Sequence, residues 1–154
     1  MTGYAAQRET AQMALRHEQA LRELFPASIV EAALSMDRAY EPPPACLPEA
    51  RVQILTGGVY QALWILSRKL QTGLCADLLK IPIRQETVEI CEVLDRDPYT
   101  LDAGGAWLIA VKDGEKAAWL CKSAQIPSAV IGETCRGTAA IVTCGETIRY
   151  LERP

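Results

Sequence analysis

The chain has 154 residues, of which 49% are hydrophobic and 23% are charged, with a net charge of -3 and a sequence pI near 5.2. This length can bury a hydrophobic core without disulfides or metals, and one domain is the natural expectation. The acidic balance argues against a nucleic-acid-binding protein, because such proteins normally present a basic face.

Neither a membrane segment nor an export signal is expected. No apolar run approaches the roughly 18–20 residues that a membrane-spanning helix needs. The first residues, Met1-Thr2-Gly3-Tyr4, are not a basic segment followed by an apolar one. We therefore expect a cytoplasmic protein without a membrane partner.

The N-terminal third has the pattern of two amphipathic helices, at 8–24 and 27–39. The first helix would bury one face, formed by Ala14, His17, Leu21, Leu24 and Phe25. His17, the only histidine of the chain, is thus expected to be packed and not catalytic. The Pro-rich stretch 41–44 then predicts a stiff linker. We expect residues 1–44 to be a helical appendage with a linker and residues 45–154 to be the main domain.

Helices and strands alternate after the linker. The predicted elements are a short strand or helix lead-in at 51–55, helices at 58–71, 84–94 and 115–124, strands at 74–79, 107–111 and 128–133, and a terminal hairpin formed by 139–142 and 147–151. The apolar run 107–111 favours a central strand that is covered on both faces. Asp113 is the expected N-cap of helix 115–124. The order predicts a layered α/β arrangement.

Six cysteines are present: Cys46, Cys75, Cys91, Cys121, Cys135 and Cys144. An even number permits disulfides, but the chain shows no export signal. No pair has Cys-x-x-Cys spacing, and one histidine is too few for a zinc or iron–sulfur cluster of the common kinds. We expect reduced, mostly buried thiols and no metal site.

Two short segments are candidate binding sites. Thr56, Gly57 and Gly58 open a helix, where backbone N–H groups and the helix dipole favour a phosphate or another anion. The alternative is a tight loop with an N-cap. Arg84, Gln85 and Glu86 begin the helix at 84–94 and are either a groove for a partner or a solvated first turn. No catalytic constellation can be assembled around a single histidine.

The acidic loop residues and the tryptophans are expected to have structural roles. Asp95, Asp97, Asp102 and Asp113 match no calcium-loop pattern and are expected to make turns and caps. The three tryptophans, Trp64, Trp107 and Trp119, are expected in the core or at an interface.

Three sequence blocks resemble a known family. Residues 57–64 (GGVYQALW), 81–91 (IPIRQETVEIC) and 126–132 (IPSAVIG) are similar to the C-terminal domain of the aminoimidazole ribonucleotide synthetase superfamily, and most of all to its hydrogenase-maturation-factor-like members. The resemblance covers 57–151 well and 1–56 loosely. It implies an α+β fold, a layered α/β/α sandwich that is partly ferredoxin-like, here with an N-terminal helical pair. Members of the family are usually dimers of two-domain chains that use ATP and magnesium.

The chain departs from that family at three places. The domain that supplies most ATP and metal contacts in relatives has no counterpart in this sequence. An acidic, histidine-containing stretch precedes the Gly-Gly pair in relatives, whereas 52–55 reads Val-Gln-Ile-Leu here. Magnesium prefers carboxylate and phosphate oxygens, which Ile54 and Leu55 do not offer. The reactive C-terminal cysteine of the cyanide-forming maturation factor is also absent, and Cys144 is a poor substitute.

Three functions remain open. The first is a non-catalytic module that forms homo-oligomers or binds another protein through its sheet face or helix 58–71. The second is half of a split ATP-dependent synthetase or hydrogenase maturation factor, which would use ATP and magnesium only with a separate ATP-binding protein. The third is a sensor of a phosphate ligand at 56–58. The chain alone is expected to bind no cofactor.

Overall fold

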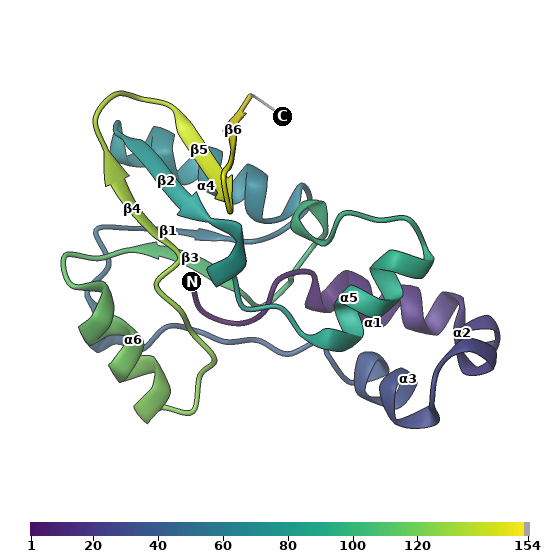
Figure 1. Ribbon diagram of the computed structural model, residues 1–154. Helices are drawn as coiled ribbons and strands as arrows, with labels where there is room; N and C mark the ends of the chain where they lie inside the picture. The colour runs from purple at the N-terminus through teal and green to yellow at the C-terminus, as the bar shows by residue number, and fades with distance from the viewer. Residues whose placement is uncertain (153–154) are drawn as a thin grey trace.

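Helices and strands are mixed along residues 1–152, the part of the chain that this computed structural model describes (Figure 1). The helices are α1 (Gln7–Arg16), α2 (Glu18–Leu24), α3 (Ala27–Leu34), α4 (Gly58–Leu70), α5 (Gln85–Val93) and α6 (Gly114–Ser123). The strands are β1 (Ala50–Gln53), β2 (Gly73–Asp77), β3 (Trp107–Ala110), β4 (Gly132–Cys135), β5 (Ala140–Cys144) and β6 (Thr147–Leu151). Short 3-10 helices are η1 (Pro44–Cys46), η2 (Leu78–Lys80) and η3 (Pro98–Thr100). The α+β class predicted from the sequence is confirmed.

The strands form two separate sheets. One has two antiparallel strands, β1 and β3, and the other has four strands in the order β4-β2-β5-β6. In the second sheet β2 and β5 are parallel, while β4 and β6 are antiparallel to their neighbours. The expected sandwich had one sheet between helices, whereas here α4 contacts both sheets and lies between them (Figure 1).

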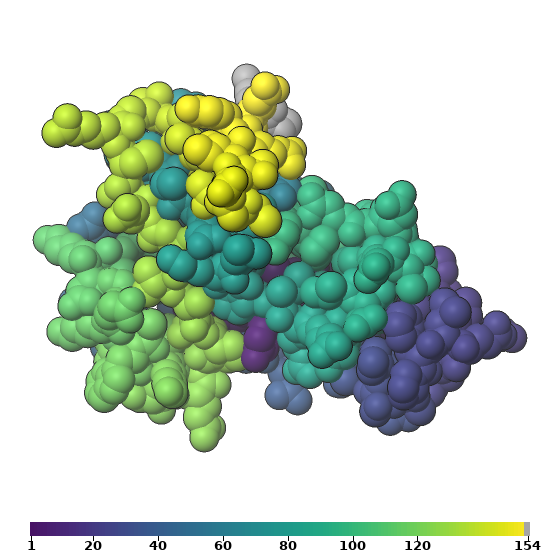
Figure 2. Space-filling model, viewed as in Figure 1, coloured from purple at the N-terminus to yellow at the C-terminus, as the bar shows by residue number. Residues whose placement is uncertain are grey.

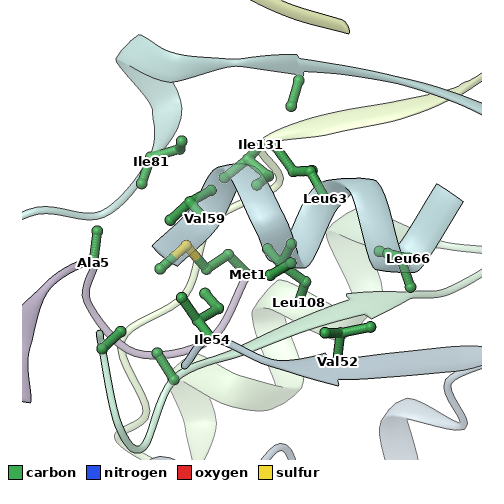
Figure 3. Packing of buried hydrophobic residues seen from close by; sticks show 14 of the residues in the cluster. Met1, Ala5, Val52, Ile54, Val59, Leu63, Leu66, Ile81, Leu108 and Ile131 are labelled. Atoms are coloured by element: carbon green, nitrogen blue, oxygen red, sulfur yellow. The ribbon is translucent and has the colours of Figure 1, made fainter. Parts of the chain in front are cut away.

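The main hydrophobic core surrounds α4. Val59, Leu63 and Leu66 project from this helix into a cluster that includes Ile54 of the segment after β1 and Leu108 of β3 (Figure 3). These three residues, at positions i, i+4 and i+7, place one apolar stripe on the helix, as the sequence predicted. Because α4 covers one face of each sheet, its apolar side chains are buried within the chain.

The first residues of the chain are part of this core. Met1 belongs to the cluster around α4 and is buried. Thr2 exchanges two backbone hydrogen bonds with Trp107, with N···O distances of 2.8 and 3.0 Å, and also bridges to Ser128. The N-terminal segment thereby extends the β1–β3 sheet by one bridge. It joins the first residues of the chain to segments more than a hundred residues away.

The N-terminal helices pack on α5 in a second hydrophobic cluster. Leu21 of α2, Val30 of α3 and Ile90 of α5 are fully buried there together with Leu101. The helices α1, α2, α3 and α5 form one side of the molecule in Figure 1. Residues before and after position 44 thus share one hydrophobic cluster. The division of the chain into 1–44 and 45–154 stays a prediction. Among the described residues, no helix has both the length and the apolar character required to traverse a bilayer.

The N-terminal helices differ from the predicted pair. The expected helix at 8–24 is broken at His17, whose φ of -116° and ψ of 20° leave the helical region. His17 is exposed at this break, so its expected position on a packed face was wrong. The expected helix at 27–39 ends at Leu34. It stops there because the chain turns to place Tyr40 N 2.7 Å from Gly105 O.

Two strand predictions also need correction. The strand expected at 128–133 begins only at Gly132, because Ala129 N and Asp77 N bond to Met1 O and Ile131 O outside a regular ladder. The apolar run from Trp107 does not form a central strand covered on both faces. It pairs with β1 and Thr2, and only Leu108 of its four residues is fully buried.

Candidate interaction site

One face of the four-stranded sheet is left uncovered by the described chain. Leu74, Ala76, Ala140 and Val142 are buried toward α4. Successive side chains of a strand point to opposite faces, so Cys75 and Ile141 face away from the helix. We call this outer surface, formed by Cys75, Asp77, Glu133, Ile141, Thr143, Ile148 and Tyr150, the open sheet face.

Strand register brings the members of this face into rows. Cys75 lies opposite Glu133 on β4 and opposite Ile141 on β5, and Ile141 lies opposite Tyr150 on β6. Directly opposed side chains of neighbouring strands have Cβ atoms about 4.5–5.5 Å apart and pack on one another. Asp77, Thr143 and Ile148 form the next row. The apolar part of the face is therefore concentrated on β5 and β6.

Ile148 and Tyr150 are the most exposed apolar residues of this face, at 64% and 65%. Both lie on β6, which is an edge strand of the sheet. Figure 2 shows the β5–β6 hairpin on the surface, beside the segment that contains η2. That segment carries Leu79, which is 71% exposed. An apolar group of this kind at a sheet edge is typical of a contact surface.

The edge strand itself lacks the usual protection against pairing. Its five residues contain no proline and a single charge, Arg149. Arg149 points to the inner side of the sheet, where its guanidinium lies 5.0 Å from the centre of the Tyr60 ring on α4. Charged residues and prolines on the outer side normally keep edge strands from adding another strand. β6 shows neither feature on its outer face.

The glycine pair before α4 has a structural explanation. A Cβ on Gly58 would lie 2.3 Å from the carbonyl oxygen of Tyr99, so only glycine fits there. The Gly58 N–H donates to Leu55 O at 2.8 Å, which occupies one donor that an anion would need. Gly57 has a φ of 85°, and Thr56 is exposed. Close approach of η3 thus accounts for Gly58, whereas at Gly57 a Cβ would collide with the side chain of Gln61. Anion binding at 56–58 stays a prediction.

Arg84 and Glu86 form an ion pair at the start of α5. Arg84 Nη2 and Nε lie 2.8 and 3.2 Å from the two carboxylate oxygens of Glu86, and this hydrogen bonding lowers the pKa of Glu86. The guanidinium of Arg84 is 5.8 Å from the Tyr4 ring centre, while Gln85 is exposed and donates to Glu89. The three predicted groove residues therefore lie together, beside the N-terminal segment. Their role toward a partner stays a prediction.

A cavity of about 470 Å³ lies between the two sheets. Its walls come from α4, β2, β3, α6 and the segment 128–134, and they are mostly aliphatic. Leu66 of α4 and both Ala117 and Cys121 of α6 are examples of this lining. The sequence does not reveal this cavity, because its lining residues come from segments that no local pattern connects. None of the predicted site residues contributes to it.

The thiols and acidic groups form no metal centre within residues 1–152, where no group of three or more histidine, cysteine or acidic side chains is placed to hold an ion. All six cysteines are free. Cys46, Cys91 and Cys121 are buried, Cys75 and Cys135 are partly buried, and Cys144 is exposed. Asp77 and Asp97 instead cap the short 3-10 helices η2 and η3 through their carboxylates, and Asp113 caps α6.

Known proteins resemble this chain in structure but not detectably in sequence. No protein-family model matches the chain, and no curated protein does either. Among solved structures, E. coli HypE, a hydrogenase maturation protein, matches with a TM-score of 0.71 and 16% identity over 99% of this chain and 48% of that one. A chain of a HypE–HypF complex matches with a TM-score of 0.67 and 20% identity over 99% of this chain and 51% of that one.

An enzyme of different activity has the same fold. Thiamine-monophosphate kinase from Stenotrophomonas maltophilia K279a matches with a TM-score of 0.63 and 20% identity over 92% of this chain and 48% of that one. The predicted resemblance is therefore confirmed: the chain has the aminoimidazole-ribonucleotide-synthetase-like fold. The likeness includes residues 1–56, which the sequence had matched only loosely. The chain spans about half the length of these structures.

Proposed function

We propose that this chain is an interaction module that self-associates through the open sheet face and the edge strand β6, and that it has no catalytic activity alone. The observation that carries the proposal is the pair Ile148 and Tyr150, both about two-thirds exposed on an edge strand without outward charge. The expected cytoplasmic location and the absence of a cofactor in the isolated chain are parts of the same proposal.

A second copy of the chain is the proposed occupant. In a two-fold symmetric dimer each subunit offers the same patch, so the patch must be complementary to itself. Two β6 strands related by a two-fold axis perpendicular to the sheet run antiparallel and can share backbone hydrogen bonds. Each would place its Ile148 and Tyr150 on the same outer side of the joined sheet. Burial of these side chains from both copies supplies the favourable free energy of association.

The test is the mass of the chain in solution, measured by sedimentation over a range of concentrations. We expect a dimer for the unaltered chain. Ile148→Lys and Tyr150→Lys should each weaken association at least about tenfold, which corresponds to about 1.4 kcal/mol, because a charge would enter the contact. Leu15→Lys and Leu24→Lys are matched controls, since those leucines are 68% and 61% exposed on the N-terminal helices. They should leave the dimer unchanged.

Two results would contradict self-association. One is a monomer at the highest concentration reached by the unaltered chain. The other is a dimer that survives both β6 substitutions while circular dichroism shows all variants folded. In the second case another surface would make the contact.

Half of an ATP-dependent assembly is the second candidate. Two findings favour it: the chain spans about half of the structures that share its fold, and one of them is a complex of HypE with HypF. Under this reading a separate ATP-binding protein would dock near Arg84 and would supply the contacts to ATP and magnesium. The acidic stretch missing at 52–55 weighs against restored catalysis.

Calorimetric titration with ATP and magnesium distinguishes the interaction module, the phosphate sensor and the split assembly. The interaction module predicts no saturable heat for the chain alone. Saturable heat that is lost in Thr56→Glu, which adds a negative charge at an exposed position, would favour the phosphate sensor at 56–58 instead. Heat that appears only after a second protein is added would favour the split assembly.

A further inference from the structure

Cys46 and Cys121 bring their thiols together inside the molecule. Their Sγ atoms are 4.0 Å apart, although the residues are separated by 75 positions in the chain. Cys46 ends η1, and Cys121 lies in the last turn of α6. The Sγ of Cys46 is also 3.8 Å from the carbonyl oxygen of Ala117, one turn earlier on α6.

This thiol pair is isolated from the other cysteines. Cys46, Ala117 and Cys121 form a small buried cluster of their own, whereas Cys91 belongs to the cluster between α5 and the N-terminal helices. Aliphatic side chains flank the pair: Ile109, Val111, Leu120 and Ile126. Each thiol of the pair thus has one cysteine in contact, which is the other member.

The surroundings permit the pair to close. A disulfide needs an S–S distance of about 2.05 Å, so the sulfur atoms must approach by about 2 Å. Cys46 is the last residue of the short 3-10 helix η1, and Leu47 follows in the left-handed region at a φ of 45°. No strand ladder holds this stretch in place. Closure would require rotation of the two side chains together with a shift of η1 toward α6.

The cavity between the sheets gives an oxidant a way in. Ala117 and Cys121 belong to its wall, so a small molecule in the cavity reaches the side of α6 that carries the thiol. A hydroperoxide is small and uncharged enough to enter a mostly aliphatic space of about 470 Å³.

We propose that Cys46 and Cys121 are a reversible oxidation site, at which a hydroperoxide converts the two thiols into one disulfide. The first thiolate attacks a peroxide oxygen, the O–O bond breaks, and the sulfur becomes a sulfenic acid while water or an alcohol leaves. The second thiol attacks that sulfur, the S–O bond breaks, and a second water leaves. Two thiols and one peroxide thus give one disulfide, and thiol reductants reverse the bond.

The bond would fasten the Pro-rich segment to α6. It closes a loop of 75 residues, which contains β1, α4, β2, α5 and β3. Burial next to the partner thiol raises the pKa of Cys46, so its thiolate is scarce at neutral pH. The reaction is expected to be slow, on the order of minutes to hours. In a reducing compartment the disulfide would be transient.

Peptide mapping of the full chain tests this site directly. The reduced protein is treated with hydrogen peroxide, its remaining thiols are blocked, and trypsin then releases residues 39–51 and 117–122 as the peptides that contain Cys46 and Cys121. We expect these two peptides to be joined with the loss of two hydrogens and to separate again in dithiothreitol. The oxidised chain should melt roughly 5–15 °C higher, because the crosslink restricts the unfolded state.

Cys144 serves as an internal control, because it is exposed and its oxidation shows that the peroxide was active. Cys46→Ala and Cys121→Ala should each abolish the joined peptide and the rise in melting temperature, whereas Cys144→Ala should keep both. The proposal is overturned if Cys144 is oxidised while peptides 39–51 and 117–122 stay separate. Oxidation of Cys121 to a sulfinic acid without crosslinking would overturn it as well.

Discussion

The hydroxyl of Thr10 on α1 donates a hydrogen bond to the hydroxyl of Thr87 on α5 at 3.1 Å, and both residues are fully buried. Thr87 in turn lies 3.7 Å from the sulfur of Met36. This polar contact fastens the N-terminal helices to the body of the chain. It occurs in an otherwise aliphatic cluster, where an unpartnered hydroxyl is unfavourable.

Removal of one hydroxyl of this pair should destabilise the whole chain. We expect Thr10→Val to lower the free energy of unfolding by about 1–3 kcal/mol, because the Thr87 hydroxyl loses its buried donor. Thr10→Val with Thr87→Val should cost less than the two single changes added together, since no lone hydroxyl remains. Urea denaturation followed by circular dichroism measures these values. Strictly additive effects would mean that the two hydroxyls do not interact.

Two glycines with similar backbone angles should respond very differently to alanine. Gly58 and Gly145 have φ values of 62° and 58°. A Cβ on Gly145 meets nothing within 4 Å, so Gly145→Ala should cost only the strain of the left-handed region, about 1 kcal/mol. Gly58→Ala adds a collision with the Tyr99 carbonyl and should cost more than about 3 kcal/mol.

The difference between these two variants isolates the close approach of η3 to α4. Thermal unfolding of both proteins gives the comparison. Equal losses would show that the loop at Tyr99 can move aside, which would leave room beside Gly58 for a bound anion. Packing would then not explain why residues 57 and 58 are glycines.

Local features of this fold were accessible from the sequence, because the signals for them lie within a few residues. The glycine pair before α4 predicted the helix start, and the turn at 144–146 predicted the terminal hairpin. Asp113 was predicted as an N-cap, and its Oδ1 accepts from Lys116 N at 2.9 Å. Each of these signals depends on the conformation of one or two residues.

Long-range pairing could not be predicted in the same way. The open sheet face requires Cys75, Ile141 and Tyr150 to lie in one row, and only the parallel register of β2 with β5 brings the first two together. The bridge from Thr2 to Trp107 likewise depends on where the whole sheet lies. His17 was misplaced because its helical spacing fits an apolar stripe although the helix breaks there.

The cap at Asp113 offers a test of one local prediction. Asp113→Ala should destabilise the chain by about 1 kcal/mol, because the Lys116 N–H at the start of α6 loses its acceptor. Asp113→Asn should restore most of the loss, since an amide oxygen can also accept that bond. Glu115→Ala removes an exposed acidic residue from the same turn and should cost only a few tenths of a kcal/mol. A loss with Asn as large as with Ala would contradict the capping role.

Stability should fall at alkaline pH because of Cys91. Burial raises the pKa of this thiol from 9.0 to about 11. Between these values the unfolded chain releases the proton and the folded chain keeps it, so the folded state binds more protons and loses stability as pH rises. Cys91 should contribute at most about 1.4 kcal/mol per pH unit to this slope. Burial also raises the pKa of Cys46, so this thiol adds a slope of the same sign to every variant that keeps it. Below the lower value both states keep the proton and Cys91 contributes no pH dependence.

Urea denaturation between about pH 8 and about pH 10 measures this slope. The window stops there because Tyr60, whose pKa is raised to about 12 mainly by burial, adds a slope of the same sign above its ordinary value of 10.0. Cys91→Ala should be less stable at neutral pH, since it empties part of a buried site, but its stability should fall less steeply above pH 9. Cys144→Ala, at an exposed thiol, should keep the slope of the unaltered chain. If Cys91→Ala and the unaltered chain lose stability equally steeply with pH, groups other than Cys91 cause the loss of stability at alkaline pH.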